Sequence, residues 1–508
     1  MHFPRAAGLL LHPTSLPGRF GIGSLGHNAE RFIELLSRCG MQLWQVLPLG
    51  PTGYGNSPYQ SLSAFAGNPL LICLERLQQD GLLSEHDLAN APAFNARRVD
   101  FGAVIPFYAE MLKSAFGTFQ HRDYPELQAE YEQFLHQQAD WLPDYALFSA
   151  LKKHFGGGPW TDWPKELVRR QKAAMQQWRE KLAEQREAVS FQQFLFFRQW
   201  QAIKGRANEA GIRIIGDIPI FVAHDSADVW ANQNRFHLNP DGQPKVVAGV
   251  PPDYFSETGQ LWGNPLYRWQ VMSRQNYTWW AARMKQTLHV MDIVRIDHFR
   301  GFEAYWEVAG DAENAIIGRW VKGPGAALFH ALREQLGELP IIAEDLGVIT
   351  PEVEALRDGF DFPGMKVLQF AFGSDSSNEY LPHNYPPNCV VYTGTHDNDT
   401  SIGWLGGNTH ADYDQLGQEQ QMALRYMGLL NAQDFHWAII RLAFSSTASM
   451  AVIPLQDALG LGNEARMNVP GRADGNWEWR YVEESIPDWV IDRLADMVWL
   501  YGRQPQPA

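Results

Sequence analysis

Residues 293–301 read Ile-Val-Arg-Ile-Asp-His-Phe-Arg-Gly, a short apolar run that ends in a carboxylate. Seven further short runs, all mostly apolar, are predicted as strands: Gly8–Leu11, Leu43–Leu47, Ile212–Gly216, Pro340–Ala343, Val367–Phe370, Val390–Tyr392 and Ala451–Pro454. Because they lack strict alternation, they are typical of parallel strands covered on both faces. Amphipathic stretches such as 29–39 and 326–335 separate them. Eight such units predict an α/β fold of the (β/α)8 TIM barrel type.

Two longer segments interrupt this alternation. Residues 70–200 are rich in helix formers, with apolar residues at helical spacing around 127–155 and 191–203. We predict that 70–200 form a helical insertion subdomain between barrel strands two and three, and that 1–69 and 201–508 form the catalytic barrel. The second segment, 221–282, is crowded with Gly, Pro and aromatic residues and is predicted to be loop-like, forming extended active-site loops.

The composition limits the classes of partner. The chain has 508 residues and a formal net charge of -15, and it has no block rich in Lys and Arg, so nucleic acid and anionic membranes are excluded as partners. Aromatic residues make up 13%, which suits sugar binding as well as core packing. Cys39, Cys73 and Cys389 form no C-x-x-C pair, and no apolar run is long enough for a signal peptide or membrane span. We therefore predict a cytoplasmic protein.

A glycine-rich segment raises the alternative of a nucleotide-binding, doubly wound sheet. Gly21–Gly26 read G-I-G-S-L-G, which matches G-x-G-x-x-G. The segment lies well past the first strand, however, and the second strand ends in Pro48 with no acid to bind a ribose. No P-loop and no G-x-S-x-G motif occurs either. We reject the dinucleotide interpretation and expect no cofactor.

Four acids follow or close separate predicted strands: Asp217, Asp297, Glu344 and Asp397. One acid in such a place often only caps the next helix. Four of them on different strands predict an active site, because residues at the carboxyl ends of barrel strands face it. No cluster of His and carboxylate residues shows ligand spacing, so no metal is expected.

Strand geometry assigns chemistry to these acids. Arg295 and Asp297 are two residues apart and point to the same side, so the guanidinium is predicted to lower the pKa of Asp297. A buried salt bridge without catalysis is the alternative for Arg295. Glu344 ends a very apolar strand, where desolvation raises the pKa of a carboxyl and keeps it protonated. One ionised and one protonated carboxyl are the usual means of breaking a glycosidic bond. His298 and His396 adjoin the acids as single residues, and we interpret them as hydrogen-bond donors to sugar hydroxyls.

Three blocks now resemble a known family. They are R-I-D-H-F-R-G at 295–301, A-E-D-L-G-V-I-T at 343–350 and G-T-H-D-N-D-T at 394–400. They resemble the signature blocks of the amylomaltases, also called 4-α-glucanotransferases or disproportionating enzymes, in the α-amylase clan. Four further segments, at 12–23, 51–60, 216–222 and 259–267, are similar to the same family. The resemblance therefore covers nearly the whole chain, in order.

The resemblance implies roles by position. It makes Asp297 the nucleophile, Glu344 the acid/base and Asp397 the carboxylate that binds the reacting glucose and stabilises the transition state. The implied substrate-binding residues are Tyr59, Asp217, Arg295 and His396 at the donor subsite, Tyr254, Phe255 and Trp262 in a loop over the acceptor, Ser57, Asn264 and Phe370, and Tyr54 in a secondary glucan site.

The expected activity is retaining transfer of α-1,4-glucanyl segments between maltodextrins, with amylose and glucose among the partners and no cofactor or metal. One rival is an α-amylase-type hydrolase, which shares the catalytic acids and differs only in using water as acceptor. The other is a catalytically dead barrel that acts as a scaffold. Asp297, Glu344 and Asp397 argue against the scaffold, because a binding module does not need this trio.

Overall fold

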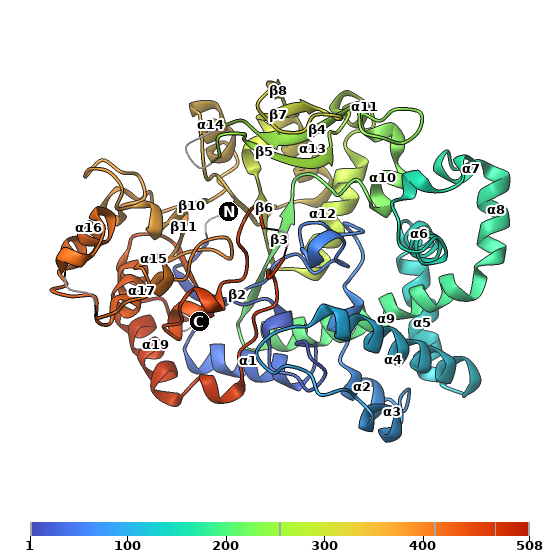
Figure 1. Cartoon of the computed structure of the whole chain (residues 1–508), viewed down its shortest axis with the longest axis horizontal. Helices are drawn as coiled ribbons and strands as arrows, with labels where there is room; N and C mark the ends of the chain where they lie inside the picture. Colours follow the sequence, from blue (N-terminus) through green and yellow to red (C-terminus); the bar gives the residue numbers. More distant parts are fainter. Residues whose placement is uncertain (1–2, 253–255, 411–412, 473, 506–508) are drawn as a thin grey trace.

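The centre of the molecule is one parallel sheet, seen in a computed structural model that describes residues 3–252, 256–410, 413–472 and 474–505 (Figure 1). In spatial order its strands are β10 (Gly364–Val367), β11 (Cys389–Tyr392), β12 (Met450–Pro454), β1 (Ala6–Leu10), β2 (Leu43–Gln45), β3 (Arg213–Pro219), β6 (Ile293–Asp297) and β9 (Ile341–Ala343). All seven neighbouring pairs are parallel. At the ends of the sheet, the Ala343 N–H donates to the Pro363 carbonyl at 2.9 Å and brings β9 against β10. The predicted (β/α)8 barrel is confirmed.

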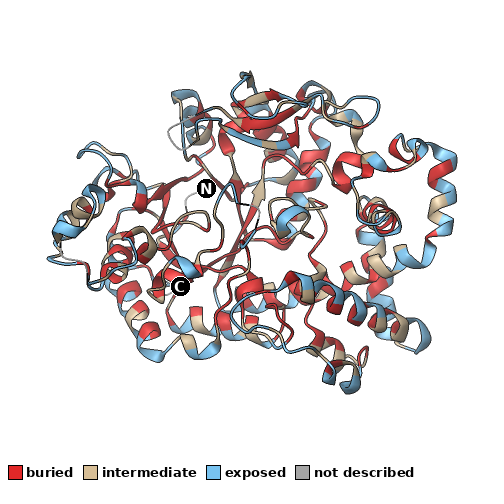
Figure 2. Cartoon of the chain, viewed as in Figure 1, coloured by how far each residue is buried: buried red, intermediate tan, exposed pale blue. Residues whose placement is uncertain are grey.

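Apolar side chains from all eight strands fill the inside of the barrel. One cluster contains Leu10, Leu43, Ile215, Ile293 and Ile342 together with residues of β10, β11 and β12. A second, larger cluster lies between the strands and the surrounding helices. Figure 2 shows the central strands buried, with helices that expose their outer faces. Burial on both faces explains why the strand sequences are apolar almost without interruption.

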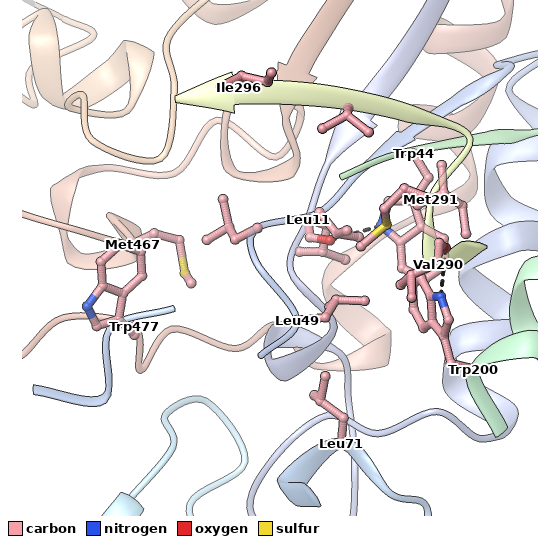
Figure 3. Packing of buried hydrophobic residues seen from close by; sticks show 14 of the residues in the cluster. Leu11, Trp44, Leu49, Leu71, Trp200, Val290, Met291, Ile296, Met467 and Trp477 are labelled. Carbon is pink, nitrogen blue, oxygen red and sulfur yellow. Dashed lines mark hydrogen bonds between the residues drawn. The ribbon is translucent and has the colours of Figure 1, made fainter. Parts of the chain in front are cut away.

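Large aromatic side chains join neighbouring strands and neighbouring outer helices. Trp44 of β2 donates its indole N–H to the Leu11 carbonyl at 2.9 Å, and Trp200 donates to the Val290 carbonyl at 2.8 Å (Figure 3). The helices outside the two interruptions are α1 (His27–Arg38), α13 (Ala326–Leu336), α14 (Pro351–Asp358), α15 (Ser401–Trp404), α16 (Gln418–Met427), α17 (Phe435–Ser445), α18 (Leu455–Ala458) and α19 (Asp488–Leu500). In the described part of the chain, no helix has the length and apolar character needed to cross a membrane.

One predicted strand is displaced in the structure. The strand expected at Val367–Phe370 occupies Gly364–Val367, and Leu368–Phe370 form a 3-10 helix. Gly364 and Lys366 conceal this strand in the sequence. Lys366 is buried because its ammonium pairs with Glu379, and a side chain at Gly364 would collide with Asp345.

Between β2 and β3 the chain forms helices. They are α2 (Leu74–Gln79), α3 (Glu85–Ala89), α4 (Phe101–His121), α5 (Pro125–Gln137), α6 (Leu142–His154), α7 (Lys165–Val168), α8 (Lys172–Lys181) and α9 (Ala183–Glu209). Aromatic contacts join them; for example, the rings of Phe119 and Phe191 stack at 4.4 Å. Helix α9 continues past residue 200 to the start of β3. The division into a barrel and an insertion subdomain at 70–200 stays a prediction.

The prediction that 221–282 is loop-like is wrong for much of the segment. It contains α10 (Ala227–Ala231), β4 (Val246–Val250), β5 (Gln260–Pro265), α11 (Trp269–Arg274) and the start of α12 (Thr278–Val290). The two strands join β7 (Ala304–Ala309) and β8 (Gly318–Lys322) in an antiparallel sheet of order β5-β4-β7-β8, at the top of Figure 1. Glycines at 249 and 263 weaken the local strand signal, and the partner strands come after β6.

Candidate active site

The four acids lie at the carboxyl ends of the barrel strands. Asp217 is in β3, Asp297 is the last residue of β6, Glu344 follows β9 directly, and Asp397 lies in the loop after β11. In the parallel register of β3 and β6, Asp217 is opposite Arg295. The carboxyl ends of parallel strands meet at one edge, so strands far apart in sequence present these acids to one region.

Asp217, Arg295 and Asp297 form a buried chain of charges. Arg295 pairs with Asp217 through one guanidinium nitrogen, and its other terminal nitrogen lies 3.1 Å from Asp297 Oδ1. Tyr59 donates its hydroxyl to Asp217 Oδ2 at 2.9 Å. The side chains of Arg295 and Asp217 are 4% and 0% exposed, whereas Asp297 keeps 32% of its side chain exposed. These charge pairs therefore hold Asp297 in place and leave its carboxylate accessible.

The protonation of Asp297 differs from the prediction. Burial outweighs the guanidinium of Arg295 and raises the pKa of Asp297 to about 6. Arg295 acts to lower this pKa, as predicted, but the predicted net lowering is wrong, because sequence spacing shows the neighbouring charge and does not show the depth of burial.

Glu344 titrates at higher pH, as predicted. Burial and then the charge of Asp297 raise the pKa of Glu344 to about 8. This rise occurs although the backbone N–H groups of His298 and Leu346 donate to the carboxyl at 2.6 and 3.0 Å. Between these two pKa values, Asp297 is ionised while Glu344 is protonated, which is the combination that a nucleophile and a general acid need.

Asp397 lies in a polar environment. Asn468 donates to its Oδ1 at 2.6 Å, and His396 Nε2 lies 3.3 Å from the same oxygen. Burial acts to raise the pKa of Asp397, but the charge and hydrogen bond of His396 and the hydrogen bond of Asn468 bring it down to about 2. Its side chain is 44% exposed. Asp397 is thus ionised throughout the neutral range and open to a ligand.

Sequence reasoning missed the segment that supports Asp397. Arg466 donates to the Asp397 carbonyl and pairs with Asp399, and the Asn468 backbone N–H donates to the His396 carbonyl at 3.1 Å. Trp477 contacts the rings of Tyr59 and His396, which themselves stack at 5.2 Å and 13°. These residues follow no apolar strand, so the strand-end rule that located the acids does not apply to them.

Strand β5 also reaches the site, through Trp262. The Trp262 indole lies edge-to-face on the His298 ring at 4.7 Å and 86°. His298 follows Asp297 in the left-handed backbone region, with φ 58 and ψ 48, which directs its N–H to Glu344. Burial lowers the pKa of His298 to about 3, so its imidazole is neutral. Tyr254 and Phe255 lie outside the described residues.

The other predicted contacts differ in availability. Tyr54 is 79% exposed and Phe370 is 38% exposed, with its ring edge-on to Tyr380 at 5.6 Å. Ser57 accepts the Tyr59 backbone N–H at 3.3 Å, and the buried Asn264 amide donates to the Val222 carbonyl at 2.9 Å. Tyr54 and Phe370 therefore present free ring surface, whereas Ser57 and Asn264 already take part in loop hydrogen bonds. Among the described residues, no group of three or more His, Cys, Asp and Glu is arranged to hold a metal ion.

A (β/α)8 barrel that brings Asp297, Glu344 and Asp397 together at the carboxyl ends of its strands is typical of enzymes that act on glycosidic bonds. A family model described as 4-alpha-glucanotransferase, of glycoside hydrolase family 77, matches residues 11–484, and the chain belongs to this family. It is 51% identical to the 4-alpha-glucanotransferase of Synechocystis over 503 residues, 98% of each chain. It is 53% identical to that of Thermus thermophilus over 484 residues, 95% of this chain and 96% of the relative. An amylomaltase from Streptococcus agalactiae, solved in complex with acarbose, superposes with a TM-score of 0.94 at 38% identity and covers 99% of this chain and 100% of its own.

Proposed function

We propose that this 4-α-glucanotransferase moves α-1,4-glucanyl segments between maltodextrins by a retaining double displacement, with Asp297 as nucleophile and Glu344 as acid/base. The observation that carries the proposal is the half-buried pair of carboxyls, Asp297 and Glu344, at the ends of the neighbouring strands β6 and β9, whose pKa values of about 6 and about 8 make one group an anion and the other an acid at neutral pH. Membership of the 4-alpha-glucanotransferase family supports transfer over hydrolysis.

In the first half-reaction, a carboxylate oxygen of Asp297 bonds to the anomeric carbon while the glycosidic bond breaks. Glu344 gives its proton to the departing 4-oxygen, and the shortened glucan leaves. In the second half-reaction, the 4-hydroxyl of the acceptor gives its proton to Glu344 and attacks the same carbon, which releases Asp297. Two inversions retain the α configuration.

The charge of Asp297 explains how Glu344 changes roles. Part of the rise in the pKa of Glu344 comes from the negative charge of Asp297. Once Asp297 is esterified to the sugar, that charge is gone and the pKa of Glu344 falls, which favours the carboxylate form that serves as a base. Asp397, ionised in the whole neutral range, would bind hydroxyls of the donor glucose and stabilise the positive charge of the transition state.

The remaining residues divide between donor and acceptor. Tyr59, Asp217, Arg295 and His396 would line the donor subsite, with Ser57 and Asn264 holding its loops. Trp262 and Phe370, with Tyr254 and Phe255, would contact the acceptor, and the exposed Tyr54 would bind a second stretch of glucan. We further propose amylose and maltodextrins as substrates, glucose as an acceptor and the cytoplasm as location. The three cysteines, all free and buried, and the net charge of -15 support the last point and the exclusion of nucleic acid.

The test is incubation with maltotriose alone. Transfer yields glucose and a ladder of longer maltodextrins with almost no change in total reducing ends, because the number of glycosidic bonds is conserved. Asp297→Asn, which keeps the shape and removes the charge, is the matched inactive control. A steady rise in reducing ends without any longer product would refute transfer and establish an α-amylase-type hydrolase.

A further inference from the structure

Trp477 has a backbone conformation that few bulky residues adopt. Its φ is 65°, in the left-handed region, although it carries a large aromatic side chain. Such a conformation costs free energy and persists only where the surroundings impose it. Here the Trp477 N–H donates to the Met467 carbonyl at 2.7 Å, which ties the segment back on itself, and the residue is 5% exposed. The bend turns a buried indole toward one place in the molecule.

The indole packs against the rings of Tyr59 and His396, which contact the carboxylates of Asp217 and Asp397. The Trp477 ring centre lies 6.0 Å from that of Tyr59 and 5.9 Å from that of His396. Tyr59 and His396 stack on each other at 5.2 Å, so the three rings form a closed triangle. Tyr59 and His396 each also carry a polar group, the phenol hydroxyl of Tyr59 and Nε2 of His396.

Those polar groups reach two of the carboxylates of the site, Asp217 and Asp397. The Tyr59 hydroxyl donates to Asp217, which holds Arg295 against Asp297, and His396 Nε2 lies 3.3 Å from Asp397 Oδ1. A shift of the Tyr59–His396 ring pair would therefore move the hydrogen-bond partner of Asp217 and that of Asp397 together. Rings packed on one another resist such a shift, since only a few offset arrangements are favourable.

We propose that Trp477 is a positioning residue of the transfer reaction: its indole locks the Tyr59–His396 ring pair and so keeps the partners of Asp217 and Asp397 in the geometry of the transition state. It acts through these two side chains. Interactions that matter mainly in the transition state lower kcat when they are lost, whereas lost ground-state binding raises KM. The proposal rests on the transferase activity proposed above.

The experiment measures kcat, KM and Tm for maltotriose disproportionation by Trp477→Leu and Trp477→Phe. The control is Trp437→Leu in α17, because Trp437 is 2% exposed and packs on Trp489 of α19 in the outer helix layer. We expect Trp477→Leu to lose at least about tenfold in kcat with KM changed less than about threefold. Trp477→Phe, which restores a ring, should recover most of the loss, and Trp437→Leu should lower Tm while kcat stays within about twofold of wild type.

Two results would overturn the proposal: an unchanged kcat in Trp477→Leu, with or without a raised KM, or equal losses of kcat in the Trp477 and Trp437 variants. If Trp477→Leu does not fold, Trp477→Met, whose unbranched side chain reaches further and adapts to an irregular space, takes its place under the same criteria. Failure of the proposed function is separate, because it would appear as the absence of longer maltodextrins with the wild-type protein.

Discussion

Two groups of acids in one site stand in opposite surroundings. Asp297 and Glu344 lie beside each other where burial dominates, and their pKa values rise to about 6 and about 8. Asp397 has Asn468 and His396 as hydrogen-bond partners, and its pKa falls to about 2 despite burial. The difference shows that local partners, more than depth, decide which carboxyl exchanges protons and which stays a fixed anion.

The largest effects on transfer activity should come from substitutions at Asp297 and Glu344. Asp297→Ala and Glu344→Ala should each lower transfer by about 10⁴-fold or more. With azide and an α-glucosyl donor that carries a good leaving group, Glu344→Ala should give the α-glycosyl azide, because the intermediate still forms and two inversions occur. Asp297→Ala should give the β-azide after one inversion. Product analysis by NMR distinguishes them, and the reverse pairing would show that the two roles are exchanged.

The pH profile tests the protonation states directly. Below pH about 6 Asp297 takes up a proton and cannot attack, and above about 8 Glu344 loses the proton that it must donate. The ratio kcat/KM should therefore be bell-shaped, falling about tenfold for each pH unit beyond either limb. Asp397, with a pKa of about 2, should add no limb in this range. A flat profile from pH 5 to pH 9 would contradict these assignments.

A smaller effect should follow at Trp262, which packs on His298 and which we propose to contact the acceptor. Water and a glucan hydroxyl give their proton to the same base, so only binding energy favours the glucan. Trp262→Ala removes stacking of about 1 kcal/mol. Transfer should fall several-fold and hydrolysis should fall less, measured as longer products against new reducing ends. Equal losses together with a lowered Tm would show that Trp262 only packs the loop.

The smallest expected effects are on stability, and they should differ in sign. The folded pKa of Glu344 is raised, so its contribution to stability is present below pH 4.5 and is lost as the pH rises to about 8. Glu344→Gln should therefore gain Tm relative to wild type across this window. Asp397 has a lowered pKa and contributes stability above pH 3.8, so Asp397→Asn should lose Tm at neutral pH. Calorimetry at pH 5 to 8 should detect shifts of about 1 to 3 °C, and shifts of equal sign would break the comparison.

The same contrast explains what the sequence could predict. Seven of the eight barrel strands and the acids that close or follow separate strands were predictable, because a strand buried on both faces is apolar in its own sequence. The strand at Gly364–Val367 was misplaced because Gly364 and Lys366 interrupt its apolar pattern. The direction of the pKa shift of Asp297 could not be predicted, because the burial of this carboxyl depends on residues from the whole site. Asn468 and Trp477 were also missed, since they reach Asp397 and His396 from a segment about 70 to 80 positions further along the chain. The antiparallel sheet was not predicted for the same reason, because β4 and β5 precede β6 in the sequence and β7 and β8 follow it.

The join between β9 and β10 has a consequence for motion. Beside the backbone bond from Ala343 to Pro363, the carboxylate of Asp345 accepts the Met365 N–H at 2.7 Å and pairs with Arg357. The side chain of Asp345, the residue after Glu344, thus replaces a backbone hydrogen bond between the two strands. A join made in this way opens more readily than a full ladder, so amide hydrogen exchange should be fastest here among the barrel's strand pairs. Glu344, the proposed general acid, would then lie beside the pair of barrel strands that separates most easily.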